Sequence, residues 1–236
     1  MVEVQKKDVR KMLVKKVHQL NDILADLDDL LTQMETDFFR VCIFGSARIT
    51  PDSPFYTQVY DLAKALSSQG IDVVTGGGPG LMEAANKGAR QGANQSRSIG
   101  LPIDLPFETD ANSHLDVKRQ HRRFSSRLDE FMRISHAVVM TPGGIGTCLE
   151  FLYTWQLLQV GHIKPRPVIL LGERFWNGFL EWFEKEPIKQ ALMSRKDMGM
   201  FTVVDSVDDV IKQLQPVIVG FRNGTAQQSL PGDLAR

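Results

Sequence analysis

Apolar residues follow two different patterns along the chain, one before residue 39 and one after it. Residues 1–38 contain no glycine or proline, and their apolar side chains recur at alternating steps of four and three. These side chains are Leu13, Val17, Leu20, Leu24, Leu27, Leu31, Met34 and Phe38. The spacing is typical of a heptad seam on one long helix. The seam either lies on the protein's own domain or pairs with a second chain, and the pattern leaves both open.

After residue 40, short apolar runs alternate with helix-like stretches. The predicted strands are 41–45, 71–77, 97–102, 137–144, 167–172 and 200–204, and the predicted helices are 54–69, 80–91, 115–134, 145–160, 175–190 and 206–215. Strands that are apolar throughout, joined by helices, indicate a parallel sheet covered on both faces. We therefore predict an α/β fold: a Rossmann-like doubly wound parallel sheet of order 3-2-1-4-5-6, with an added N-terminal helix.

This pattern predicts three parts: a helix over 1–38, a Rossmann-like domain over 39–219 and a flexible polar tail over 220–236. Lysine plus arginine and aspartate plus glutamate number 28 each, so no net charge attracts nucleic acid or a membrane surface. The charged N-terminus lacks the apolar segment of a secretory signal, and no run approaches the length of a membrane helix. Cys42 and Cys148 have no metal or redox spacing. We therefore predict a cytoplasmic protein.

Three glycine-containing turns follow predicted strands: Gly45–Ile49, Gly76–Met82 and Pro142–Thr147. Ligands of open parallel sheets bind beyond the carboxyl ends of the strands. Glycines let the backbone approach an anion closely, and the start of a helix presents N–H groups to it. The third turn therefore predicts a phosphate cradle, formed by Gly143, Gly144, Ile145, Gly146 and Thr147.

The same turns exclude several classes of protein. None reads G-x-x-x-x-G-K-[ST], which argues against a P-loop. Gly76–Met82 lacks the third glycine of the dinucleotide fingerprint and follows the second strand, which argues against a dinucleotide oxidoreductase. The five histidines are scattered and form no zinc motif. We predict no cofactor and no metal.

Charged residues near these turns are candidates for catalysis. Glu150 follows Thr147 by three residues in apolar surroundings. A carboxylate there could simply complement the helix dipole, but burying one without a role is costly, which favours a functional role. Basic residues crowd 116–133, and most fit a solvated helix face. Arg127 and Arg133 are the candidates for binding a phosphate or ribose hydroxyls through their guanidinium N–H groups.

Together these residues resemble the Lonely Guy family of phosphoribohydrolases, often described as lysine decarboxylases. The family motif PGGxGTxxE is matched in full by residues 142–150, and GGGxxGLM appears one residue shorter over 76–82. Arg127, fifteen residues before Pro142, and Arg133 match two family arginines, and Gly45-Ser46 matches the turn after the first strand. The resemblance covers about residues 40–215.

The resemblance implies a homodimer or larger homo-oligomer. It also implies cleavage of the N-glycosidic bond of nucleoside 5′-monophosphates, AMP-like or cytokinin riboside monophosphates, to free base and ribose 5-phosphate. It implies Arg127 and Glu150 as catalytic residues. The other residues that it implies, as substrate-binding, are Ser46, Gly76, Gly77, Gly78, Gly80, Met82 and Arg133, beside the cradle at 143–147.

One departure from the family keeps other functions open. Leu128 stands where the family usually has a lysine after its catalytic arginine. It favours the alternative of a non-catalytic nucleotide-binding regulatory protein, whereas the heptad seam would fit a scaffolding dimer. Lysine decarboxylation is disfavoured, because none of the glycine turns contains a lysine for a Schiff base.

Overall fold

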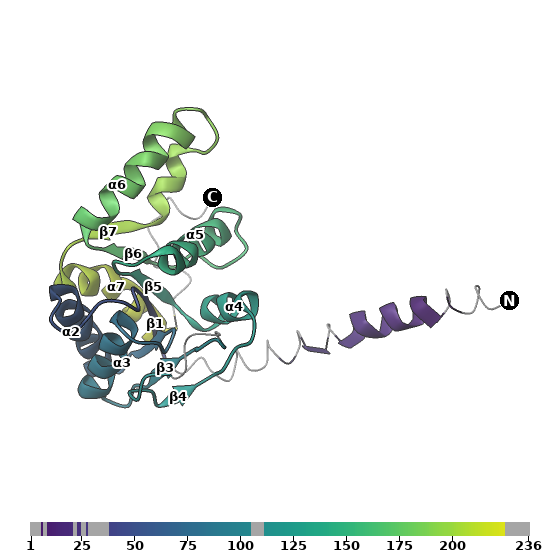
Figure 1. The fold of residues 1–236 in the computed structure, drawn as a ribbon, viewed down its shortest axis with the longest axis horizontal. Coiled ribbons are helices and arrows are strands. Elements are labelled where there is room, and N and C mark those ends of the chain that lie inside the picture. The colour runs from purple at the N-terminus through teal and green to yellow at the C-terminus, as the bar shows by residue number, and fades with distance from the viewer. Residues whose placement is uncertain are drawn as a thin grey trace. The chain divides into compact units, whose positions relative to one another are not determined.

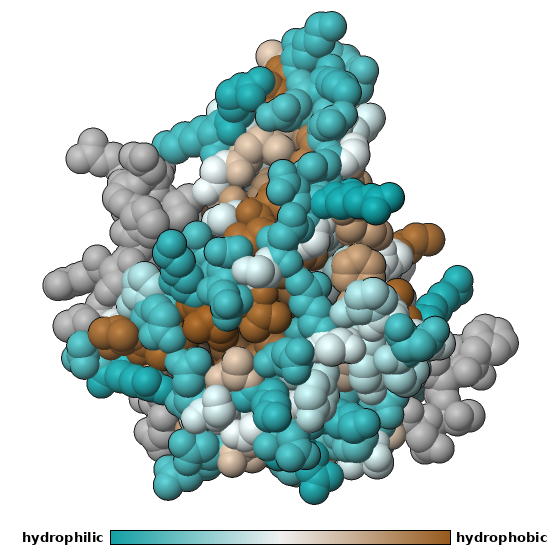
Figure 2. All heavy atoms as spheres, turned by 90° about the vertical axis from the view of Figure 1, so that its left-hand side faces the viewer, coloured by the Kyte–Doolittle hydropathy of each residue, from teal (hydrophilic) through white to brown (hydrophobic). Residues whose placement is uncertain are grey.

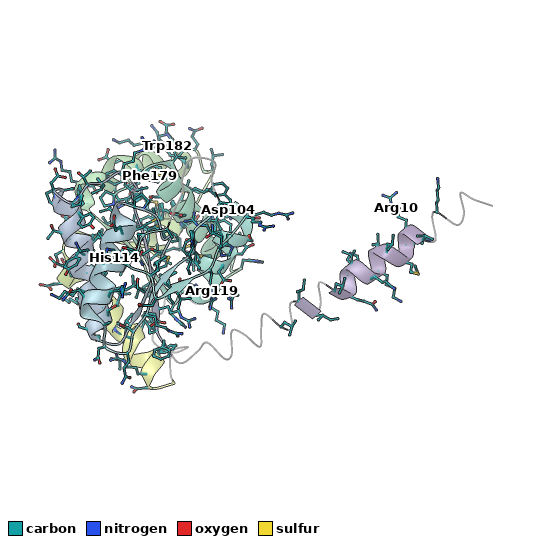
Figure 3. The ribbon with its side chains drawn as sticks, turned by 60° about the horizontal axis from the view of Figure 1, so that its bottom comes forward. Arg10, Asp104, His114, Arg119, Phe179 and Trp182 are labelled. Atoms are coloured by element: carbon teal, nitrogen blue, oxygen red, sulfur yellow. The ribbon has the colours of Figure 1, made fainter. Side chains whose placement is uncertain are left out.

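A computed structural model of the protein describes residues 38–104 and 111–224 and, before them, residues 6, 9–20, 23–24 and 27. The chain divides into two compact units, residues 1–37 and 38–236. In the first unit residues 9–20 are helical, and the seam residues Leu13, Val17 and Leu20 are about half exposed. Arg10 lies on this helix (Figure 3). Leu31 and Met34 of the predicted seam lie outside the described residues, as does 225–236 of the predicted tail.

The second unit is built on a seven-stranded parallel sheet (Figure 1) of order β4-β3-β2-β1-β5-β6-β7. The strands are β1 (Arg40–Phe44), β2 (Asp72–Thr75), β3 (Ser98–Gly100), β4 (Val117–Lys118), β5 (Ala137–Met140), β6 (Val168–Leu171) and β7 (Thr202–Val204). The predicted fold class is confirmed. The six predicted strands occur in the predicted order, and β4 adds an edge strand beside β3.

Helices cover both faces of this sheet (Figure 1). On one face lie α2 (Pro54–Ser68), α3 (Leu81–Gly92) and α7 (Val207–Arg222), and on the other lie α4 (Phe124–Ile134), α5 (Ile145–Gln159) and α6 (Glu173–Phe183). Side chains alternate along β1, so Val41 and Ile43 belong to the first core and Cys42 and Phe44 to the second. Both faces are therefore buried, as the uniformly apolar strands predict.

Polar side chains dominate one face of the molecule (Figure 2). On the face shown in Figure 2, hydrophilic side chains cover most of the surface and hydrophobic ones are visible mainly in its middle. Phe179 and Trp182 lie on α6 (Figure 3), and both rings pack against Phe183. Among the residues that the structure describes, no helix combines the length and apolar character needed to cross a membrane.

The predicted helix over 115–134 is wrong in its first part. The Asp116 N–H donates to the Ser98 carbonyl (2.8 Å) and the Arg119 N–H to the Gly100 carbonyl (3.0 Å), so this segment pairs with β3. The helix α4 begins only at Phe124. The polar residues of an edge strand carry no apolar strand signal, and pairing with a distant segment overrides local preference.

Two other helices end at different residues from those predicted. α6 ends at Phe183 and passes into a π-helical turn, Glu184–Ile188, that contains Pro187. Proline has no N–H for the regular helical bond, which explains the change. α7 continues through Arg222, past its predicted end at 215, because Ile218 is fully buried in the core. Residues 220–222 are therefore helical instead of belonging to the predicted tail.

A histidine is held neutral at the amino edge of the sheet. The His136 Nδ1 accepts from the Arg40 N–H (3.0 Å), and its ring stacks on Phe39 with centroids 5.2 Å apart. The ring also meets the edge of Phe221 at 4.8 Å. Burial, helped by the charges of Arg40 and Arg166, lowers the pKa of His136 from 6.5 to about 4.

We predict that His136 makes stability depend on pH. The neutral ring contributes stability that is fully present above pH 6.5 and is lost as pH falls through about 4, because only the unfolded chain protonates readily between these values. The unfolding free energy of the wild type relative to His136→Gln should therefore shrink between pH 7 and pH 4, by at most about 3 kcal/mol. Urea denaturation measures it. Exposed His162 provides the control, His162→Gln, and a pH-independent difference for His136→Gln would contradict the prediction.

Candidate active site

Ser46 joins the three glycine turns at the carboxyl edge of the sheet. Its N–H donates to the Pro142 carbonyl after β5 (3.1 Å), and its carbonyl accepts from the Leu81 N–H at the start of α3 (2.9 Å). Gly80, the residue before α3, has φ +69°, and a Cβ there would lie 2.4 Å from the Ser46 carbonyl oxygen. Only glycine fits this position, and the backbones of all three turns consequently come into contact.

The turn after β5 leaves the start of α5 open. Gly144 precedes the helix, and no side chain caps its first N–H groups. A Cβ on Gly144 or on Gly146 would meet no atom within 4 Å, and Ile145 between them is 91% exposed. Thr147 is instead buried against the turn, since a Cβ on Gly143 would lie 2.1 Å from its Oγ1. Uncapped N–H groups at an accessible helix start are suited to bind an anion.

The loop after β2, Gly76–Gly78, is packed against Met82. A Cβ on Gly76 would lie 2.7 Å from the Met82 sulfur, and one on Gly78 would lie 2.8 Å from its terminal methyl. Gly77 has φ +74°, a left-handed conformation that favours glycine. The predicted binding residues of this turn therefore form one closely packed unit with Met82.

Arg127 is fixed against this loop. Its Nε donates to the Leu101 carbonyl (2.6 Å) and its Nη2 to the Gly76 carbonyl (3.3 Å). A Cβ on Gly76 would lie 2.3 Å from the same Nη2, so the guanidinium occupies the space where a side chain would be. The guanidinium also lies over the ring of Phe131, 5.3 Å from its centroid. The first turn of α4 thus places an oriented cation at the carboxyl edge.

Glu150, in the second turn of α5, interacts electrostatically with Arg127. Its side chain is partly buried. Burial raises the pKa of the Glu150 carboxyl from 4.5 to about 7, and the Arg127 charge opposes that rise. The structure therefore puts the Glu150 carboxyl within electrostatic reach of Arg127, and burial brings the pKa of this carboxyl to about 7.

Arg133 lies in a different set of contacts, with Glu130. Its Nε and Nη2 donate to the two carboxylate oxygens of Glu130 at 2.9 and 2.8 Å, and the Arg119 Nη1 donates to the same carboxylate at 2.6 Å (Arg119 is labelled in Figure 3). Burial alone would raise the pKa of Glu130, but these hydrogen bonds lower it. Arg133 thus forms an ion pair six residues along α4 from Arg127.

Sequence reasoning missed a set of polar residues behind the Gly76–Gly78 loop: Thr75, Asn86, Ser98 and Asn112. They hydrogen-bond to one another and to the loop. Asn86 is fully buried on α3, on the face of the small residues Ala85 and Ala89. The sequence did carry one signal for this set: Asn86 stands among small residues of a helix face that is expected to be buried. A buried amide needs hydrogen-bond partners, which predicts other polar residues nearby.

The described residues offer no group of three histidine, cysteine, aspartate or glutamate side chains arranged to hold a metal ion. Cys42 and Cys148 are free thiols. The arrangement defines a class of protein: a doubly wound α/β protein with an uncapped helix start after β5 and, on that helix, a carboxyl whose pKa burial raises to about 7.

Comparison with known proteins identifies the family. The family described as "Possible lysine decarboxylase" matches residues 82–214, more than half of the chain. The chain therefore belongs to this family, the Lonely Guy family.

Named relatives share most of the chain. "Probable cytokinin riboside 5'-monophosphate phosphoribohydrolase LOG4" of Oryza sativa subsp. japonica is 27% identical over 176 residues, which are 74% of this chain and 75% of that protein. "Pyrimidine/purine nucleotide 5'-monophosphate nucleosidase" of Escherichia coli K12 is 33% identical over 184 residues, 74% of this chain but 40% of that protein. The crystal structure of the structural-genomics target TM1055 shares the fold, with a TM-score of 0.58 and 23% identity over 75% of this chain and 99% of that one.

We predict that the Glu150 carboxyl destabilises the fold as it ionises. The pKa of this carboxyl is about 7 in the folded protein and 4.5 in the unfolded chain. Its contribution to the free energy of unfolding is therefore fully present below pH 4.5 and is lost as pH rises through about 7. Glu150→Gln cannot ionise, so its gain in unfolding free energy over the wild type should grow from pH 4.5 to pH 8, by up to about 3 kcal/mol.

Denaturation of both proteins across this pH range measures the gain. The exposed Glu173 on α6 supplies the matched control, Glu173→Gln, which should show no comparable growth. His136 titrates in the opposite sense, and comparing each variant with the wild type separates the two groups. A gain for Glu150→Gln that stays constant with pH would show that Glu150 ionises normally in the folded protein.

Proposed function

We propose that this protein is a hydrolase that cleaves the N-glycosidic bond of nucleoside 5′-monophosphates and releases free base and ribose 5-phosphate. The observation that carries the proposal is the Glu150 carboxyl, which lies on the helix with the uncapped start and interacts electrostatically with Arg127. Membership of the family and the names of the two relatives support the same reaction. The substrate is an AMP-like nucleotide or a cytokinin riboside 5′-monophosphate.

The 5′-phosphate binds at the start of α5. The N–H groups of Gly143, Gly144 and Gly146 and the Thr147 hydroxyl hold its oxygens, helped by the positive end of the helix dipole. The open space at Gly144 and Gly146 gives the phosphate access to the backbone. Nucleosides without a phosphate forgo this binding energy and are poor substrates.

Glu150 acts at the sugar. Departure of the base leaves positive charge at C1′, as in other cleavages at an anomeric carbon, and an anionic carboxylate stabilises that charge or orients the attacking water. The partial burial of Glu150 strengthens this electrostatic effect. Its ionised form is the active one, and a pKa near 7 keeps that form available at neutral pH.

Arg127 acts beside Glu150 on the ribose phosphate or the leaving base. Two backbone carbonyls hold its guanidinium in one orientation, so little ordering remains to be done when the substrate binds. The Gly76–Gly80 turn and Met82 line the base side, and Ser46 lies at the floor between the turns.

A panel of 5′-monophosphates tests the proposal. We expect the purified protein to release base and ribose 5-phosphate, detected by chromatography, from at least one of AMP, GMP, CMP, UMP and a cytokinin riboside monophosphate. The matching nucleosides should react at least about 100-fold more slowly, since they cannot use the phosphate site. Tight binding of AMP without cleavage would instead support a nucleotide-binding regulatory protein, the alternative that Leu128 favours.

The role of Glu150 predicts a pH profile. For the wild type, turnover should rise about tenfold per pH unit below pH 7 and level off above it, because the carboxylate is the active form. Glu150→Gln should lower kcat by about 10²–10⁴-fold and lose this dependence. Whatever pH dependence remains in the variant reports the substrate phosphate. Wild-type turnover by Glu150→Gln would refute the assignment.

The homodimer implied by the family resemblance stays a prediction, and α5 is one surface that could form it. Ile145, Leu149 and Leu152 lie on one face of this helix and are 91%, 45% and 39% exposed. In a C2 dimer such a face can pack against its own copy. Light scattering should then give a dimeric mass for the wild type and a monomeric mass for the double variant Leu149→Glu, Leu152→Glu.

Leu192→Glu, at an exposed leucine outside α5, should remain dimeric. A monomeric wild type would contradict the dimer itself. A dimer that survives the double variant would exclude α5 and leave the N-terminal heptads as the alternative contact.

A further inference from the structure

A buried chain of hydrogen bonds runs behind the Gly76–Gly78 loop. The Thr75 Oγ1 accepts from the Gly77 N–H (2.9 Å) and donates to the Asn86 Oδ1 (2.7 Å). The Asn86 Nδ2 donates in turn to the Ser98 hydroxyl (2.9 Å). Asn86 and Ser98 are almost completely buried, so these polar groups satisfy one another without water. The end of β2, α3 and β3 are thereby tied together at one point.

Asn112 closes this chain onto the loop from a distant segment. Its Nδ2 lies 3.1 Å from the Gly77 carbonyl oxygen, 3.0 Å from that of Gly78 and 2.9 Å from the Asn86 Oδ1. Its backbone N–H also donates to the Gly77 carbonyl (2.8 Å). One side chain therefore fixes two successive peptide carbonyls of a loop made only of glycines, which has little rigidity of its own.

Fixing these carbonyls also fixes an N–H group on the other side of the loop. Within a trans peptide the carbonyl and the N–H point in opposite directions, so holding the Gly77 carbonyl on Asn112 turns the Gly78 N–H away from Asn112. No described residue accepts a hydrogen bond from this N–H, although Gly78 is buried. A substrate bound on that side of the loop would find this N–H as a hydrogen-bond donor.

The same loop holds Arg127. The Gly76 carbonyl, one peptide before the glycines that Asn112 binds, accepts from the Arg127 Nη2. A shift of the loop therefore displaces one of the two carbonyls that orient the guanidinium. The proposed phosphate site is on a separate turn, at the start of α5.

We propose that Asn112, acting through Asn86 and Thr75, is a positioning residue for the hydrolase reaction. It orders the Gly76–Gly78 loop so that the Gly78 N–H and Arg127 face the nucleoside part of the substrate. The expected change in kcat rests on the proposed function, whereas the ordering of the loop by Asn112 does not. It assigns the loop to orientation of the nucleoside and leaves phosphate binding to α5.

The kinetic test uses Asn112→Ala in the full chain. We expect kcat to fall about 10- to 100-fold, because small displacements of a catalytic group have effects of this size. The inhibition constant of ribose 5-phosphate, which reads the phosphate site, should stay within about threefold. Asn94→Ala removes another loop asparagine, exposed and bonded to the Ser68 carbonyl, and should behave as the wild type. An unchanged kcat for Asn112→Ala, or a parallel loss of ribose 5-phosphate binding, would overturn the proposal.

The structural test is hydrogen exchange followed by mass spectrometry without substrate. Asn112→Ala should exchange faster than the wild type in peptides covering residues 76–82, and at the wild-type rate in peptides covering 143–150. Equal exchange at 76–82 would overturn the proposal whatever the activity. If the wild type itself cleaves no nucleotide, the proposed function fails, and this measurement alone decides whether Asn112 orders the loop.

A second variant guards against misfolding of Asn112→Ala. Thr75→Val keeps the shape of the side chain and removes the hydroxyl that joins Gly77 to Asn86. It should show the same pattern, a lower kcat with ribose 5-phosphate inhibition preserved and faster exchange at 76–82. If Thr75→Val folds and behaves as the wild type, the claim that Asn112 acts through Asn86 and Thr75 is overturned.

Discussion

The rest of the site depends on the close contact of backbone turns at the carboxyl edge of the sheet. A Cβ on Gly45 would lie 2.2 Å from the Thr141 hydroxyl, and one on Gly80 would lie 2.4 Å from the Ser46 carbonyl oxygen. The absence of these side chains lets the turns after β1, β2 and β5 pack together. That packing sets the start of α5 and the Gly76–Gly78 loop at the same edge of the sheet, the edge at which ligands of such folds bind.

The pKa values of Glu130 on α4 and Glu150 on α5 are shifted in opposite directions because their surroundings differ. Glu130 accepts hydrogen bonds from Arg119 and Arg133, and its pKa is lowered. Burial raises the pKa of Glu150 to about 7, and only the charge of Arg127 opposes the rise. A compensated ion pair stabilises the packing of a helix, whereas a carboxyl that titrates near neutral pH is suited to chemistry.

Much of the fold could be predicted because its signals are local. Strands buried on both faces are apolar throughout, so β1, β2, β5 and β6 and their order followed from the pattern. β4 could not be found this way, because a polar edge segment becomes a strand only by pairing with β3. The end of α7 was missed for a similar reason, since burial of Ile218 carries that helix past Pro216.

By itself, the sequence determined the fold class, the glycine turns and the spacing that sets Glu150 one turn after Thr147, because turns and helix spacing depend on neighbouring residues. The tertiary structure alone decided which charges meet. It placed Arg127 with Glu150 and Arg133 with Glu130, and it set Asn112 behind the Gly76–Gly78 loop. Burial and electrostatic partners come from segments far apart in the chain, so no local pattern records them.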